Sequence, residues 1–335
     1  MALLRKINSK ARAEINTGFG SNTSAYGGRF INKDGNANIE KRGVGILEQI
    51  SWYHTLLAIP RWKFIALIFI YYIVINLLFA CVYYVLGPNH IAGMVYHSPT
   101  ERFSEAFFFS CQTFTTVGYG RVNPVGVLTS GIAAFEALLG LLTIALITGL
   151  LFGRFAKPVA YLRFSENAVI APFQGITAFM FRVAPYKNTT LLDAEVKISL
   201  AMALEENGKM VNKFYPLTLE YEKVNALTIS WTIVHPITEE SPLYKYTKQD
   251  FSEATGEFMV FLKAFDDMFS NTVVARTSYT FKEIIVGAKF EPMFNRSEEG
   301  HKTILHLGKL NSYIPADIDF SFSTESVKEK VTSNS

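Results

Sequence analysis

The segment Thr115-Thr116-Val117-Gly118-Tyr119-Gly120 contains the residues whose chemistry can be interpreted most directly. We expect an extended backbone here, with successive carbonyl oxygens pointing to one side. Four copies around an axis would then stack rings of oxygens that replace the water shell of a dehydrated K⁺ ion. The segment therefore predicts a selectivity filter that ends at Gly120 and binds K⁺ at Thr116, Val117, Gly118 and Tyr119.

The two glycines of this segment support the same interpretation. Gly118 and Gly120 are needed because the expected conformation uses backbone angles that a side chain resists. One chain supplies only a quarter of each oxygen ring, so the segment predicts a homotetramer. K⁺ in the filter is the only cofactor that we expect, and no organic cofactor is predicted. The alternative is a Gly-rich turn, which the same six residues would favour in a soluble protein.

The sequence on either side of the filter decides between these alternatives. Residues 64–86 carry no formal charge and are long enough to cross about 30 Å of hydrocarbon, and residues 125–155 form a second apolar span. Residues 102–114 are too short to span and are predicted to form a re-entrant pore helix, whose C-terminal dipole favours a cation. Non-helical backbone at membrane depth must line water or be buried in protein, and a filter meets that condition. We therefore assign residues 44–158 to a transmembrane pore domain, with its filter at residues 115–120.

A short amphipathic helix is predicted over residues 46–59, just before the first span. Ile46, Ile50, Tyr53 and Leu57 recur at helical spacing in this segment. Such a segment suits a slide helix that lies in the membrane interface. The alternative is an ordinary amphipathic helix docked on protein.

Two side chains of the second span are candidates for a function. Phe152 lies on one helical stripe with Thr148, Ala145 and Leu141, and four Phe152 rings facing the axis could close the inner mouth by excluding water. The alternative is a Phe in contact with lipid or the protein core. Glu136 is a carboxylate inside the span, where an ionisable group is functional by default. On an ideal helix it lies far around from Phe152, so we expect it near the back of the filter.

Basic residues lie at one end of each span. Arg61 and Lys63 precede the first span, Arg154 and Lys157 close the second, and the connecting segment has few. This asymmetry predicts a multi-pass protein of the cell (inner) membrane with both termini in the cytoplasm. The same four side chains could attract anionic lipids, at about 1 kcal/mol per charge. Topology alone would explain the four residues equally well.

The pattern changes after residue 159, where short runs rich in β-branched and aromatic residues are separated by turn signals such as Asn207-Gly208. Several short strands and little helix predict an all-β sandwich over residues 159–320. The expected strands are 168–171, 176–183, 193–204, 217–221, 227–235, 258–265, 273–279 and 303–307. Residues 1–43 and 321–335 are polar and are predicted to be flexible tails.

Composition narrows the remaining classes of function. The net charge of +3 is too small to suggest nucleic acid binding. Hydrophobic residues make up 49% of the chain. Cys81 and Cys111 cannot make a disulfide framework or a four-ligand zinc site. We find no Ser-His-Asp signature, His-Glu-x-x-His motif or phosphate loop, so no enzymatic activity is predicted. The alternative to a channel is a membrane-tethered β-sandwich receptor with a degenerate pore loop.

The chain resembles the inward-rectifier potassium channel family over roughly residues 40–320. Three stretches carry the resemblance: Ala106-Phe107-Phe108-Phe109-Ser110 with the filter, Phe155-Ala156-Lys157-Pro158 with Phe164-Ser165-Glu166-Asn167-Ala168-Val169-Ile170, and Thr232-Ile233-Val234-His235-Pro236-Ile237 with Ser241-Pro242-Leu243-Tyr244. The resemblance implies a tetramer with a cytoplasmic immunoglobulin-like sandwich, a slide helix, and a bundle-crossing gate at Phe152. It also implies that anionic lipids bind at Arg61, Lys63, Arg154, Lys157 and Lys187.

The resemblance also implies block by intracellular Mg²⁺ or polyamines at acidic residues. Asp193, Glu222 and Glu283 match acidic positions of the family's cytoplasmic vestibule, whereas Ile144 stands where strong rectifiers have an acidic residue in the second span. We therefore expect weak block at most. The alternative is that the three acidic residues are ordinary solvated surface carboxylates.

The surroundings of the filter differ from the family's eukaryotic branch. There a pore-helix Glu braces the filter against an Arg, and Gln112 and Val122 occupy those positions here. Arg121 follows the filter, where prokaryotic members commonly carry Asp or Lys. The bracing must therefore differ, and we expect Glu136 and Gln112 to support the filter. The eukaryotic outer cysteine pair is also missing, which suggests the prokaryotic branch.

Overall fold

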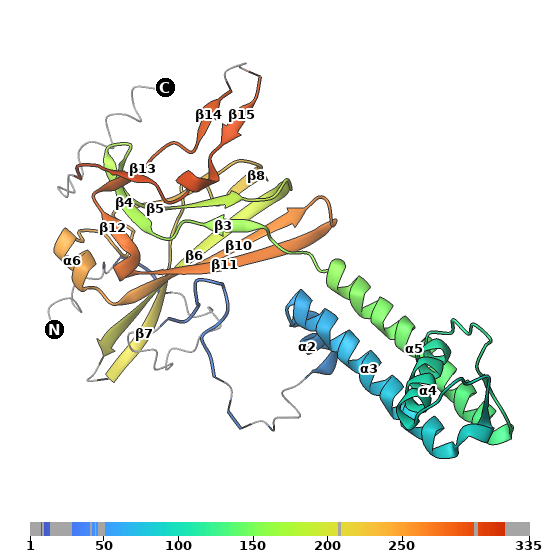
Figure 1. Ribbon diagram of the computed structural model, residues 1–335. Coiled ribbons are helices and arrows are strands. Elements are labelled where there is room, and N and C mark those ends of the chain that lie inside the picture. Colours follow the sequence, from blue (N-terminus) through green and yellow to red (C-terminus); the bar gives the residue numbers. More distant parts are fainter. Residues whose placement is uncertain are drawn as a thin grey trace. The chain divides into compact units, whose positions relative to one another are not determined.

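The computed structural model describes residues 8, 10–13, 29–40, 42–43, 45, 51–206, 209–297 and 301–318. The chain forms two compact units (Figure 1). The helical unit comprises Lys41–Lys157, and the β unit comprises Pro158–Ser335 together with Met1–Glu40.

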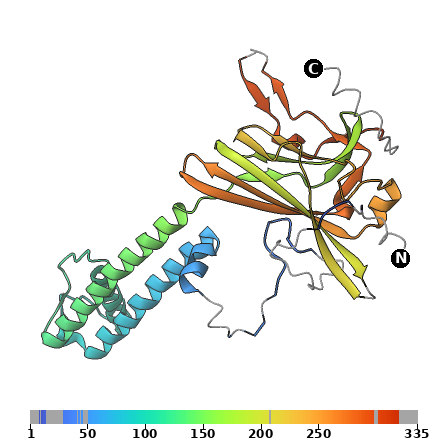
Figure 2. The same ribbon diagram turned by 180° about the vertical axis from the view of Figure 1, so that it is seen from behind.

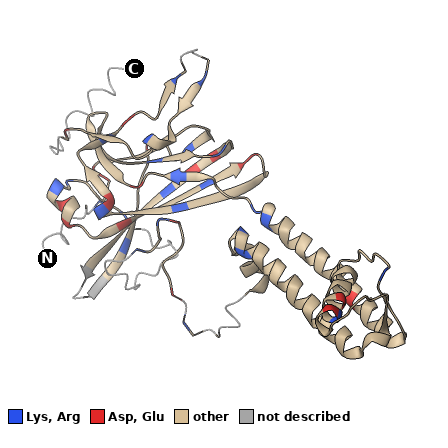
Figure 3. Ribbon diagram, in the orientation of Figure 1, with Lys and Arg blue, Asp and Glu red and all other residues tan. Residues whose placement is uncertain are grey.

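The helical unit consists of two long apolar helices and a shorter helix between them. Helix α3 (Arg61–Leu86) and helix α5 (Val127–Phe155) contain 26 and 29 residues, so each spans roughly 40 Å, more than the hydrocarbon core of a bilayer. Among the described residues, these are the two helices long and apolar enough to cross a membrane. Figure 3 shows that charged residues lie at their ends and elsewhere in the chain, and hardly at all along their length.

Helix α4 (Pro99–Phe114) covers the predicted pore helix, and it begins three residues earlier than the sequence predicted. The Ser98 side chain caps it by accepting a hydrogen bond from the Glu101 N–H at 3.2 Å, and Pro99 suits the first helical position. Helix α4 packs on α3 through aromatic pairs, among them Tyr83 and Phe109 with ring centres 4.9 Å apart.

Helix α2 (Trp52–Ala58) precedes α3 and covers part of the predicted slide helix. Ser51 caps it by accepting a hydrogen bond from the His54 N–H, and residues 46–50 of the prediction lie outside the described residues. Two short elements close the outer loops of this unit. Strands β1 (Ile91–Ala92) and β2 (Asn123–Pro124) pair, and a 3-10 turn, η2 (Pro88–His90), precedes β1.

The β unit is a sandwich of two five-stranded sheets, which Figure 2 shows from behind. One sheet has the order β12-β4-β5-β3, with β9 also paired to β5, and the other has β11-β10-β6-β7, with β8 also paired to β6. The pairs are antiparallel except β12 with β4. The strands are β3 (Leu162–Phe164), β4 (Ala168–Phe173), β5 (Ile176–Pro185), β6 (Leu191–Glu206), β7 (Lys209–Pro216), β8 (Lys223–Leu227), β9 (Trp231–Pro236), β10 (Gly256–Asp266), β11 (Asn271–Thr280) and β12 (Ile284–Val286).

Aromatic side chains from both sheets fill the space between them. Phe179 of β5 stacks on Phe258 of β10 with ring centres 4.3 Å apart, and Phe181 and Tyr279 pack beside them. All four side chains are fully buried. Each such ring stabilises the fold by roughly 1.5–3 kcal/mol through its burial. The predicted all-β sandwich is therefore confirmed.

Smaller elements cover the sandwich. They are α6 (Lys248–Glu253), η3 (Phe281–Glu283), η4 (Leu307–Lys309), the pair β13 (Ala288–Phe290) with β16 (Tyr313–Pro315), and the pair β14 (Phe294–Arg296) with β15 (Thr303–Leu305). The predicted run 303–307 is strand only over β15, because η4 begins at Leu307.

Two predicted strands differ from the structure. Residues 217–221 are not a strand, although Leu217 and Leu219 are buried. The Leu217 N–H donates to Ile198 of one sheet and the Glu220 N–H to Val234 of the other, so the segment crosses between the sheets. The predicted run 227–235 divides into the last residue of β8 and most of β9, separated by residues 228–230.

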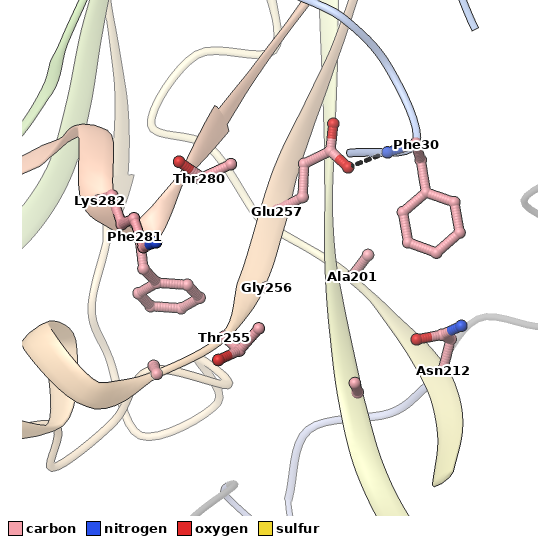
Figure 4. A pocket seen from close by; sticks show the side chains of 11 residues that line it. Phe30, Ala201, Asn212, Thr255, Gly256, Glu257, Thr280, Phe281 and Lys282 are labelled. Carbon is pink, nitrogen blue, oxygen red and sulfur yellow. Dashed lines mark hydrogen bonds between the residues drawn. The ribbon is translucent and has the colours of Figure 1, made fainter. Parts of the chain in front are cut away.

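The described residues 29–40 differ from the predicted flexible tail because they pack on the β unit. Phe30 and Ile31 are buried, and the carboxylate of Glu257 accepts both of their N–H groups. The Ser278 hydroxyl donates to the Ile31 carbonyl at 2.6 Å. Figure 4 shows Phe30 and Glu257 at a cavity of about 110 Å³ beside these contacts. Two buried apolar side chains, together with hydrogen bonds and ion pairs to the β unit, therefore anchor the segment.

Candidate ion-conducting site

The filter backbone alternates between two conformations. Thr116, Gly118 and Gly120 have φ of 60°, 52° and 83°, whereas Val117 and Tyr119 between them have negative φ. In a fully extended strand successive carbonyls point to opposite sides, so the expected extended backbone is corrected here. A backbone whose φ alternates in sign can instead bring successive peptide groups to the same side. The segment thus has the backbone shape that a carbonyl-lined filter requires.

The C-terminal end of α4 holds the inner end of the filter. The Gln112 carbonyl accepts hydrogen bonds from the N–H groups of Val117 at 2.9 Å and Gly118 at 3.3 Å. The Thr116 N–H donates to the Thr113 carbonyl at 3.0 Å. These bonds satisfy carbonyls that the helix leaves free at its end. Gln112 therefore contacts the filter through its backbone carbonyl, a detail that no sequence pattern indicates.

Helix α5 lies directly against the end of the pore helix at Gly140. A Cβ atom on Gly140 would lie 1.8 Å from the Phe114 carbonyl oxygen, so no other residue fits there without displacing α4. Gly140 thereby lets α5 pack directly against the backbone of the residue that ends α4.

A buried polar cluster lies behind the pore helix and contains Glu136. Its carboxylate accepts a hydrogen bond from the Tyr83 hydroxyl at 2.6 Å and is also hydrogen-bonded to the Ser110 hydroxyl of α4. Ser110 Oγ lies 3.0 Å from Asn76 Oδ1, and the Asn76 amide donates to the Tyr72 carbonyl at 2.7 Å. The cluster links α3, α4 and α5. Its members Tyr83 and Ser110 were missed, because each is an ordinary residue in its own helix and only the fold brings them to Glu136.

The C-terminal end of α5 is attached to α2. The Arg154 guanidinium donates to the carbonyls of Leu56 at 2.5 Å and Ile59 at 2.6 Å, and lies 4.5 Å from the centre of the Phe64 ring. Phe152, two residues before Arg154, leaves 73% of its surface exposed in the single chain. Arg154 therefore positions the end of α2 next to the candidate gate.

The other predicted lipid-binding residues are exposed. Arg61 and Lys63 lie at the start of α3, and Lys157 follows α5. Lys187 belongs to the β unit, where its ammonium lies 4.0 Å from the centre of the Tyr161 ring.

The three predicted vestibule carboxylates all lie in the β unit. Asp193 is exposed and forms an ion pair with Lys223 at 2.9 Å, and Glu222 is also exposed. Glu283 is half-buried and pairs with Arg29 and, at 3.7 Å, with Lys33. The positive partners offset part of the charge of Asp193 and Glu283.

These features define a class of protein. Two membrane-length helices, a re-entrant pore helix and a backbone filter are the parts of a two-span ion channel, here followed by a β sandwich. A family model described as "Ion channel" matches residues 62–157, and one described as "Inward rectifier potassium channel C-terminal domain" matches residues 162–329. The chain is 34% identical over 288 residues to the inward rectifier potassium channel Kirbac3.1 of Paramagnetospirillum magnetotacticum, covering 84% of this chain and 95% of that protein.

The chain belongs to the inward-rectifier potassium channel family, in its prokaryotic branch, and is a transmembrane potassium channel. The predicted family is thereby confirmed. A solved structure of Spo0M, a sporulation control protein from Bacillus subtilis, aligns over 39% of this chain and 50% of its own, with 11% identity and a TM-score of 0.22. That likeness is too low to bear on the fold or the function.

Proposed function

We propose that four copies of this chain form a K⁺-selective pore in the cell (inner) membrane, with both termini and the β domain in the cytoplasm. The observation that carries the proposal is the alternating backbone of residues 116–120, anchored by the Gln112 carbonyl. Val117 and Tyr119 expose 54% and 79% of their surface in the single chain. A fourfold assembly would cover apolar side chains such as these and complete each ring of oxygens.

The gate of this pore is Phe152 on the free face of α5. Leu141, Ala145 and Thr148 share its stripe and are exposed as well. Four such stripes around an axis would line the inner cavity, and four Phe152 rings at its cytoplasmic end would exclude water and stop K⁺. The β domain drives this gate through the junction of α5 with α2.

Anionic lipid regulates the pore at the basic residues of the cytoplasmic interface. Arg61, Lys63, Lys157 and Lys187 present exposed charges there, each contributing on the order of 1 kcal/mol to the attraction. Arg154 belongs to the same group, but two of its nitrogens already bind α2 carbonyls. We therefore assign Arg154 mainly to positioning α2, with lipid contact as its lesser role.

Block by Mg²⁺ or polyamines is weak in this proposal. Ile144 offers no charge in the cavity, and Asp193 and Glu283 are already paired with basic residues. Glu222 is exposed and remains the strongest of the three candidate blocker sites.

Flux measurements test the proposed function directly. Purified protein in liposomes should carry K⁺ and exclude Na⁺, and mass measurement should give a tetramer. Gly118→Asp should abolish the flux, because a side chain at φ 52° strains the filter and a carboxylate would occupy it. A functional monomer that is indifferent to Gly118→Asp would instead support the membrane-tethered receptor.

A further inference from the structure

Arg121 connects three segments at the outer end of the filter, directly after Gly120. Its Nη2 donates to both carboxylate oxygens of Glu105, at 2.9 and 2.7 Å. Its Nη1 donates to the carbonyl of Gly93 at 3.1 Å. Glu105 belongs to the pore helix and Gly93 to the loop after α3, so one guanidinium joins both to the residue that follows the filter.

The backbone around Arg121 is fitted to this arrangement. Gly93 has φ of 83°, and a Cβ there would lie 1.8 Å from the Arg121 carbonyl oxygen. The loop can therefore lie against the backbone of Arg121 only with glycine at this position. The Asn123 amide also donates to the Gly120 carbonyl at 2.8 Å, which fixes the last filter residue from the other side.

An isolated surface ion pair contributes little to stability, because solvent screens the charges and two side chains lose conformational freedom when they pair. This pair differs in its geometry. The Glu105 side chain is only 19% exposed, whereas that of Arg121 is 52% exposed. The guanidinium makes two hydrogen bonds to the Glu105 carboxylate and a third to the Gly93 carbonyl on a separate segment. Charge-assisted hydrogen bonds of this kind are roughly twice as strong as neutral ones.

The Glu136 cluster does not hold the outer end of the filter. It holds the middle of the pore helix through Ser110, and the inner end of the filter is held by Gln112. Neither contact reaches Tyr119 or Gly120. The outer end of the filter therefore depends on Arg121 and Asn123 among the described residues.

We propose that the Arg121–Glu105 ion pair, joined to Gly93, is a clamp that holds the outer half of the filter in its conducting shape. Arg121 and Glu105 are then positioning residues for K⁺ selectivity, although neither touches the ion. The proposal rests on the filter function assigned to residues 116–120.

The test compares four variants in liposomes, each measured for K⁺ and Na⁺ permeability. Arg121→Gln and Glu105→Gln should each lower the ratio of K⁺ to Na⁺ permeability by about tenfold, as expected for the loss of a charged hydrogen bond. The double variant should be no worse than either single one. The exchanged pair Glu105→Arg with Arg121→Glu should recover part of the ratio.

Glu101→Gln is the matched control, because it removes the same charge from the same helix. Its amide oxygen can still accept from the His97 N–H, as the Glu101 carboxylate does. Selectivity should stay at the wild-type value in this control. All variants should remain tetrameric, because the clamp acts on the filter and not on assembly. Wild-type ratios in both single variants would overturn the proposal.

Hydrogen exchange over residues 117–122 provides a second readout that requires no flux. The amides of this segment should exchange faster in Arg121→Gln and in Glu105→Gln than in Glu101→Gln, and equal rates would overturn the clamp. Absence of K⁺ flux in the wild-type protein would count against the proposed function, while the exchange rates would still decide whether the clamp exists.

Discussion

At the scale of single residues, His235 shows how a family motif can serve the fold. The ring is almost fully buried in the β unit, with Nδ1 2.6 Å from the Thr218 carbonyl and Nε2 2.8 Å from the Ser241 hydroxyl. The carbonyl can only accept, so Nδ1 carries the proton, and in the neutral ring Nε2 accepts from the Ser241 hydroxyl. Burial favours this neutral ring over the charged one. Burial accordingly lowers the pKa of His235 to about 4.

Protonation of His235 should destabilise the β unit in acid. The pKa is lowered from 6.5 in the unfolded chain to about 4 in the folded one, so the unfolded state binds more protons between these values. Stability from this residue is present above pH 6.5 and is lost as the pH falls towards 4, by on the order of 3 kcal/mol. Thermal unfolding measured across this range should show the loss.

Variants separate this effect from the titration of carboxylates in the same range. His235→Gln should flatten the dependence of stability on pH, whereas His301→Gln, at an exposed position, should leave it unchanged. An identical pH dependence in wild type and His235→Gln would contradict the assignment.

At the scale of elements, the junction of α2 and α5 shows how a short helix is held. Helix α2 has seven residues, too few to be stable by itself in water. Arg154 binds two carbonyls at its C-terminal end, where a positive charge also favours the helix dipole. A Cβ on Gly153 would lie 3.2 Å from the Tyr53 hydroxyl, so a larger residue there would crowd α2. A movement of α5 would therefore move α2.

Removal of the Arg154 charge should loosen α2. In Arg154→Gln the amides of residues 55–59 should exchange several-fold faster, because two carbonyls lose a charged donor. Lys157→Gln removes an equal charge at an exposed position and should leave these rates unchanged. If both variants exchange alike, α2 is held by packing and not by the guanidinium.

At the scale of the whole molecule, conduction requires faces of α5 that the single chain leaves uncovered. Phe152 and Leu141 are 73% and 59% exposed, which only an assembly or a membrane would tolerate in large apolar side chains. Apolar side chains are exposed in the single chain both where a helix lines a pore and where it faces lipid. A flux measurement distinguishes these two kinds of surface.

Replacement of the Phe152 ring should make the pore leak. Phe152→Ala shortens the proposed barrier, so water and K⁺ would enter a closed gate and basal uptake in liposomes should rise several-fold. Leu146→Ala is the control, because Leu146 is 69% exposed but lies on a different face of the same helix. Equal basal uptake in the two variants would show that the constriction is elsewhere.

The sequence alone determined the parts of this protein that depend on local composition. Apolar runs of membrane length predicted the two spans, with Glu136 as the one carboxylate inside the second, since charges in the hydrocarbon region are costly and therefore rare. The residues of the filter determined its chemistry, since its ligands are backbone oxygens and its glycines permit positive φ. Short runs rich in β-branched and aromatic residues, separated by turn signals, likewise predicted most of the long strands of the sandwich.

Only the tertiary structure decided which distant groups meet. Tyr83, Ser110 and Glu136 lie on three helices, Arg121 reaches Glu105 and Gly93, and Glu257 binds the backbone of Phe30. No periodicity encodes such contacts, because each partner is an ordinary residue of its own segment. Their energies appear only when folding excludes water from both partners, so the supports of the filter and the anchoring of residues 29–40 could be found only in three dimensions.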